Sequence, residues 1–185
     1  LRARKWWMEE YEETKTLKAL MGYTIMALYT YIPPLRNDFG CVMLVHSEPI
    51  DKKRNYYWVE RGAFYLNHFK TMKRYPDEPP IIFPPILKKI VTEWIKKSKA
   101  KVYLFSKQNN DAYAGCLNNN KANSFTNEVK KAASRFIKGA NISINVLRKS
   151  KVTSLKGKNE EVRIKTARAM RHSLSTATHA YMRTS

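Results

Sequence analysis

The sequence is poor in cysteine and in long hydrophobic runs. Its two cysteines, Cys41 and Cys116, lie far apart and form no CxxC pattern. This spacing predicts neither a zinc site nor a disulfide framework, and it favours a reducing, intracellular compartment. The longest apolar run, residues 20–34, is interrupted by Thr, Gly and Tyr and falls short of the ~20 residues that a membrane-spanning helix needs. We therefore expect no membrane span, and no secretory signal peptide is visible.

Acidic residues are also scarce, which argues against a metal-dependent nuclease. There are 15 acidic residues against 35 lysines and arginines. A two-metal site would need more carboxylates than Asp38 and Asp51, and no third acid has a suitable spacing. Asp38 is interpreted as a residue that orients Arg36, or simply as a turn residue. Three histidines also lack metal-ligand spacing: His46, His68 and His179. We expect no metal and no cofactor.

Positive charge is abundant, with a formal net charge of +20 over 185 residues. Such an excess repels itself unless a polyanion screens it. The basic residues are spread over segments that are predicted to be ordered, so double-stranded DNA is the favoured partner; an anionic membrane surface is the alternative. A hydrophobic content of 43% is sufficient for the core of one folded domain.

Hydrophobic periodicity predicts a mainly helical α+β domain with a small antiparallel sheet. Prolines 33 and 34 should end the second helix, and Pro85 should begin the next. The aromatic and β-branched segments 55–60 and 63–69, separated by Arg-Gly, predict a hairpin. The expected helices are within 1–20 and at 17–32, 84–99, 126–139, 142–157, 159–170 and 173–182; further strands are expected at 39–46 and 102–105, and residues 70–80 are expected to form a basic turn.

The C-terminal segment "AMRHSLSTATHAYMRTS" (169–185) allows two interpretations of Tyr181. Leu174, Ala177 and Tyr181 recur at helical spacing, which is typical of a core-facing stripe. Alternatively, Tyr181 attacks a phosphodiester. Because a phenol has a pKa of about 10, that chemistry needs cationic neighbours that favour the phenolate and balance the charge on phosphate.

The order of basic residues favours the second interpretation. An early arginine (Arg36) is followed by a lysine after the hairpin (Lys70), by N-x-x-R on a helix and by R-H-S, and Tyr181 comes nine residues after His172. This pattern resembles the catalytic domain of the tyrosine recombinase (phage integrase) family. The stretches that look particularly like recombinases of virophages and giant viruses are 26–40, 65–75, 143–154 and 170–182.

The resemblance implies the fold of the DNA breaking-rejoining enzymes and a role for each matched residue. Arg36 and Arg148 would clamp the scissile phosphate, and His172 would donate to it or position it. Lys70 would protonate the departing 5′-oxygen, with Lys73 as the alternative if the hairpin register differs. Tyr181 would attack to give a 3′-phosphotyrosyl link, without metal or cofactor.

Two departures from the family pattern affect these expectations. Asn145 stands where the family usually has His, and an amide cannot shuttle a proton. Only "MRTS" follows Tyr181, so assembly into a dimer on one site, or a tetramer of two, is an expectation of the family alone.

The resemblance also implies a domain organisation and a viral setting. Residues 1–8 are interpreted as the end of a linker from a missing N-terminal DNA-clamping domain, and 9–185 as the catalytic domain of a viral site-specific recombinase or integrase. Such a protein would act in the host nucleus or in a cytoplasmic factory. A type IB topoisomerase and a cleavage-deficient basic DNA-binding module are the alternatives.

Overall fold

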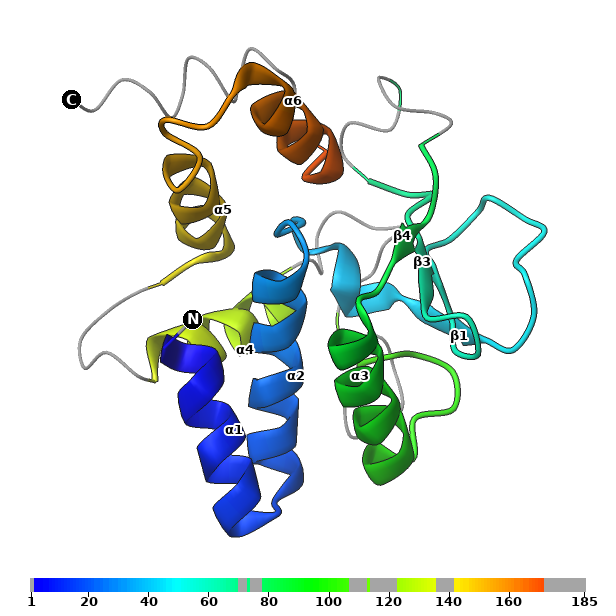
Figure 1. Ribbon diagram of the computed structural model, residues 1–185. Helices are drawn as coiled ribbons and strands as arrows, with labels where there is room; N and C mark the ends of the chain where they lie inside the picture. Colours follow the sequence, from blue (N-terminus) through cyan, green and yellow to red (C-terminus); the bar gives the residue numbers. More distant parts are fainter. Residues whose placement is uncertain are drawn as a thin grey trace.

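The computed structural model describes residues 2–69, 73, 78–106, 113, 123–135 and 142–171. Over these residues the protein is an α+β domain in which helices flank a small sheet (Figure 1). The helices are α1 (Arg2–Thr14), α2 (Leu17–Tyr31), α3 (Pro85–Ser98), α4 (Asn123–Ser134), α5 (Ile144–Thr153) and α6 (Glu160–Ala169), with a 3-10 turn at Asp38–Cys41; the strands are β1 (Met43–Val45), β2 (Tyr56–Trp58), β3 (Ala63–Tyr65) and β4 (Ile81–Ile82).

Helices α1 and α2 pack side by side at the N-terminal end of the chain (Figure 1). Thr16 caps α2 by accepting a hydrogen bond from the Ala19 amide, and the prolines end the helix at Tyr31 as predicted. Residues 2–8, interpreted above as the end of a linker, belong to α1. Within them, Trp7 is buried and its Nε1 donates to the Ala132 carbonyl of α4 at 2.8 Å.

The sheet has the strand order β1-β2-β3-β4. The sequence predicted an antiparallel sheet, but the observed sheet is mixed. The hairpin β2–β3 is confirmed, with Tyr57 opposite Phe64. Strand β1, however, pairs with β2 in parallel. The intervening loop, 46–55, therefore returns the chain to the end of the sheet where β1 began, as parallel pairing requires. The predicted strand at 102–105 is reduced to a single bridge between Met43 and Tyr103.

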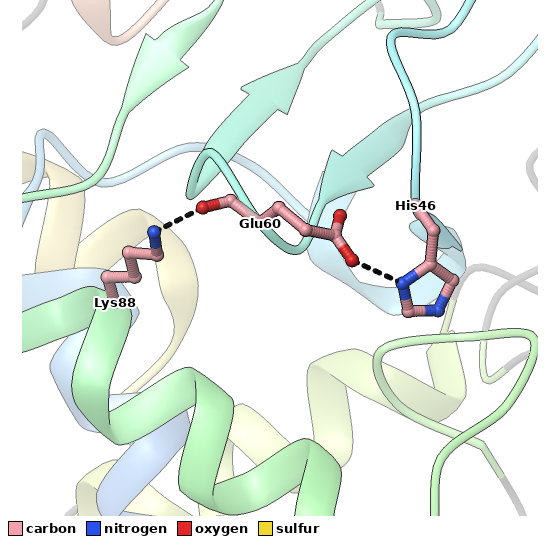
Figure 2. Close-up of polar contacts among 3 residues, drawn as sticks. All are labelled: His46, Glu60 and Lys88. Carbon is pink, nitrogen blue, oxygen red and sulfur yellow. Dashed lines mark hydrogen bonds and ion pairs between the residues drawn. The ribbon is translucent and has the colours of Figure 1, made fainter.

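Hydrogen bonds join the turn between β2 and β3 to helix α3 and to the chain just after β1 (Figure 2). The Glu60 carbonyl accepts a hydrogen bond from Lys88 of α3, and its carboxylate pairs with His46 Nδ1 at 2.6 Å. Gly62 has a φ of 69°, and a Cβ there would lie 2.7 Å from the Lys88 side chain. Glycine is therefore required both by the backbone conformation and by the space.

The core lies between the sheet and helices α2, α3 and α4. The predicted stripe of α3 is largely confirmed, with Leu87, Ile90, Val91 and Trp94 buried, whereas Ile86 is exposed. Aromatic rings connect the sheet to the chain beyond it: Tyr57 stacks on Phe83 with ring centroids 5.0 Å apart, and Phe39 packs on Phe64 at 5.2 Å.

Helices α5 and α6 lie together beyond the C-terminal end of α2 (Figure 1). Ser143 caps α5, and Asn159 caps α6 by accepting from the Val162 amide at 2.9 Å. Glu160 and Glu161 occupy the first turn of α6, as predicted. Carboxylates there interact favourably with the helix dipole and stabilise the helix. Helix α6 ends at Ala169, three residues before His172 in the sequence.

Several sequence expectations fall on other parts of the chain. The predicted helix at 173–182 lies outside the described residues, as do Cys116 and most of the basic turn 70–80. Cys41 is disulfide-bonded, against the expectation from sequence; separation along the chain does not prevent a bond, because folding joins distant residues. No helix in the described part of the chain is both long and apolar enough to cross a membrane.

Candidate functional site

Three of the six predicted catalytic residues lie within the described structure. They are Arg36, Asn145 and Arg148. Lys70, His172 and Tyr181 lie outside it, so their predicted roles stay predictions. Lys73, the alternative general acid, is exposed.

Arg148 joins the chain after α2 to the end of α6. Its side chain, 1% exposed, donates from Nη1 to the Pro34 carbonyl at 2.9 Å and from Nη2 to the Met170 carbonyl at 3.1 Å. These carbonyls precede Arg36 and His172 by two residues each. One guanidinium on α5 therefore brings together three segments that are far apart in the sequence.

The Asp38 carboxylate lies within electrostatic reach of both predicted phosphate-binding arginines. Its Oδ2 accepts a hydrogen bond from the Arg36 amide at 3.1 Å, and the Arg36 carbonyl accepts from the Tyr29 hydroxyl at 2.6 Å. This contact is with the Arg36 backbone, so it fits a turn residue as well as one that orients Arg36. The turn that carries Arg36 is held from both sides.

The electrostatics of Asp38 are set by opposing effects. Burial raises the pKa of the carboxyl from 3.8 to about 6, although Arg148, the Arg36 amide and the Arg36 charge all act to lower it. The pKa of Tyr29 is raised well above its usual value, chiefly by burial and then by Asp38. For both acidic groups, burial therefore outweighs the opposing effect of the Arg148 charge.

Asn145 and Arg148 differ in their surroundings although they are three residues apart on α5. Asn145 is exposed, whereas Arg148 is buried. The spacing predicted a shared helical face, and the structure instead places the boundary between solvent and interior between these two side chains. An exposed amide remains accessible to a bound phosphate, while Arg148 is engaged with backbone carbonyls.

Arg171 is a residue of this region that sequence reasoning missed. Its side chain is buried and forms an ion pair with Glu78 at 2.8 Å. It also donates to the Pro79 carbonyl at 3.4 Å, and its guanidinium lies 5.5 Å from the centroid of the Phe69 ring. These contacts connect the end of α6 to the end of the hairpin and to the start of the segment that leads into β4.

The backbone of Arg171 is in the left-handed region, with φ of 53°. Helices commonly end on a residue of this kind, and glycine is the usual choice because other residues incur about 1–2 kcal/mol. An arginine directly before the predicted His172, at a helix end where glycine is preferred, is the signal in the sequence that could have identified it.

A cleft of about 410 Å³ lies between α6 and the chain around β4. Arg171 and Glu78 form part of its wall, and the exposed residues Glu161, Lys165 and Arg168 line it from α6. The wall therefore carries both signs of charge, and Lys165 and Arg168 are the groups in it that can bind phosphate oxygens. Within the described residues, no group of three potential ligands could hold a metal ion.

No protein-family model, no curated protein and no solved structure matches the chain.

Proposed function

We propose that this protein is the catalytic domain of a site-specific DNA recombinase that uses Tyr181 as a nucleophile. The observation that carries the proposal is the placement of Arg148. Its guanidinium contacts the carbonyls of Pro34 and Met170, so the segments that lead to Arg36 and His172 meet at the helix of the N-x-x-R motif. The contacts support the proposal because segments so distant in sequence must meet if the motif residues are to share one site.

In the proposed reaction the Tyr181 oxygen attacks the scissile phosphorus and the bond to the 5′-oxygen breaks. Lys70, or Lys73, protonates that leaving oxygen, and the phenol proton passes to water. Arg36, Arg148 and His172 stabilise the charge that develops on the phosphate. The phosphotyrosyl link conserves the energy of the broken bond, so a second 5′-hydroxyl can attack it and rejoin the strands.

A second candidate function is a basic DNA-binding module that has lost cleavage. The observation that favours it is the burial of Arg148, whose terminal nitrogens both donate to backbone carbonyls. A guanidinium has further N–H donors, so phosphate binding stays chemically possible. Asn145 also favours the binding module, because an amide cannot carry charge or shuttle a proton during cleavage.

A trapping experiment separates these functions. The protein is incubated, in EDTA, with a pool of nicked duplexes of randomised sequence that release the fragment after cleavage and so prevent religation. The proposed enzyme forms an adduct that resists denaturation, and Tyr181→Phe abolishes it. Tyr11→Phe is the matched control, because the Tyr11 hydroxyl donates to Glu93 between α1 and α3.

Each alternative gives a different result. Adduct from wild type but not from Tyr181→Phe supports the recombinase chemistry. Bound DNA without any adduct identifies the binding module. Cut DNA without adduct that appears only when EDTA is replaced by a divalent metal contradicts the phosphotyrosyl mechanism. Relaxation of a supercoiled plasmid with random sequence would instead identify a topoisomerase.

A further inference from the structure

We infer that Arg171 is a positioning residue that sets the hairpin end against the end of α6, and so aligns the groups that follow each of them in the sequence. This inference rests on the proposed function. Phe69 directly precedes Lys70, and Arg171 directly precedes His172. The contact between Arg171 and Phe69 holds together the two described residues that stand immediately before these predicted groups in the chain.

The contacts of Arg171 come from both sides of the 70–77 segment. Phe69, which lies before it, packs under the guanidinium, and Glu78, which lies after it, forms the ion pair at 2.8 Å. The Pro79 carbonyl accepts a further hydrogen bond. A single side chain therefore fixes both chain ends of the basic segment, including the end next to Lys70, relative to α6.

The backbone of Arg171 explains why these contacts point to a function of the side chain. At φ of 53° glycine is favoured over every other residue. The position nevertheless carries an arginine that is 5% exposed, with its charge balanced by Glu78. Substitution by glycine would relax the backbone, so any loss that it causes comes from the missing guanidinium.

The ion pair suits positioning better than phosphate binding. Arg171 is buried, and its fork already engages a carboxylate and a carbonyl. The planar guanidinium can pair with Glu78 and stack on Phe69 at the same time, which an ammonium cannot reproduce. Arg171 therefore acts through its neighbours in the chain rather than by touching DNA.

The test compares Arg171→Gly, Arg171→Lys and Glu78→Gln with wild type in the adduct assay on nicked random-sequence duplexes. Arg171→Gly should lower the rate of adduct formation at saturating DNA about 100-fold, because small misplacements of reacting groups have effects of that size. DNA affinity should stay unchanged, since one buried cation contributes little to phosphate binding. The rate of adduct formation by Arg171→Lys should lie between those of wild type and Arg171→Gly.

Two further measurements exclude a purely structural role. Arg171→Gly should lower the rate less in the Glu78→Gln background than in wild type, because both changes break one interaction. Trp94→Phe removes the hydrogen bond from Trp94 to the Leu104 carbonyl in another part of the core. It should lower the melting temperature while cleavage stays normal.

The outcomes distinguish a failure of the positioning role from a failure of the proposed recombinase function. Adduct from wild type with a normal rate for Arg171→Gly overturns the positioning role alone. A loss of rate shared by Trp94→Phe in proportion to its lower melting temperature also overturns it. Absence of adduct from wild type, with DNA bound, overturns the proposed function and this inference together.

Discussion

Single residues around Arg148 illustrate how an interior position accommodates charge. A buried guanidinium is unfavourable unless polar partners replace its water, and here the carbonyls of Pro34 and Met170 do so. Arg36 and Arg148 were predicted from sequence because the order of motif residues resembles a known family, and their roles stay predictions. Arg171 was not identified, because its partners Glu78 and Phe69 are about a hundred residues away in the chain, and only the fold brings them together.

The Asp38→Asn variant should gain stability relative to wild type as the pH rises, measured as the free energy of unfolding. The folded-state pKa of Asp38 is raised from 3.8 to about 6, so its contribution to stability is present at low pH and is lost as the pH rises through 6. Asparagine does not titrate. The difference in unfolding free energy between the two proteins should therefore shift by about 2 kcal/mol between pH 4 and pH 7.5, measured by urea unfolding.

Asp51→Asn provides a control with the opposite sign. Asp51 is exposed, and the Tyr56 hydroxyl and the Lys53 amide lower its pKa. Its stabilising effect is present above its unfolded-state pKa and is lost as the pH falls. The Asp51→Asn variant should therefore have a lower free energy of unfolding than wild type at neutral pH. Equal pH dependence in both variants would contradict the assigned environments.

Elements were predictable where local pattern determines them. Helix α3 follows from its apolar spacing and Pro85, and the ends of α2 and α6 follow from the double proline and from Asn159. The parallel pairing of β1 with β2 was not predictable, because strands of three residues carry little register information. Which strands meet is decided by the aromatic core, and those contacts are distant in sequence.

Gly62→Ala should destabilise the hairpin more than Gly157→Ala destabilises the turn after α5. Both glycines have positive φ, so each substitution strains the backbone by about 1–2 kcal/mol. At Gly62 the new Cβ also meets Lys88 at 2.7 Å, whereas nothing lies within 4 Å at Gly157. We expect about 1–3 kcal/mol of extra loss at Gly62, measured by chemical denaturation. Equal losses would mean that Lys88 moves away freely.

At the scale of the whole molecule, the arrangement places α5 and α6 over one end of the domain through a few charged contacts (Figure 1). Most of the remaining core is a continuous aromatic and aliphatic cluster around α2, α3 and the sheet. The charge excess and the α+β class were evident from composition and pattern. The meeting of segments at Arg148 was an expectation from the family resemblance, and the contacts themselves come from the fold.

The net charge of +20 predicts DNA binding that depends strongly on salt. If the domain covers about six to ten phosphates, affinity for a random-sequence duplex should fall about a thousandfold or more between 50 and 200 mM salt. Fluorescence anisotropy measures this slope. Arg168→Gln, at the cleft beside α6, should reduce the slope by about one, whereas Lys5→Gln on α1, where Lys5 pairs with Glu9, should leave it unchanged. Affinity that is insensitive to salt, or equal effects of the two variants, would show that the cleft face is not the side that meets DNA.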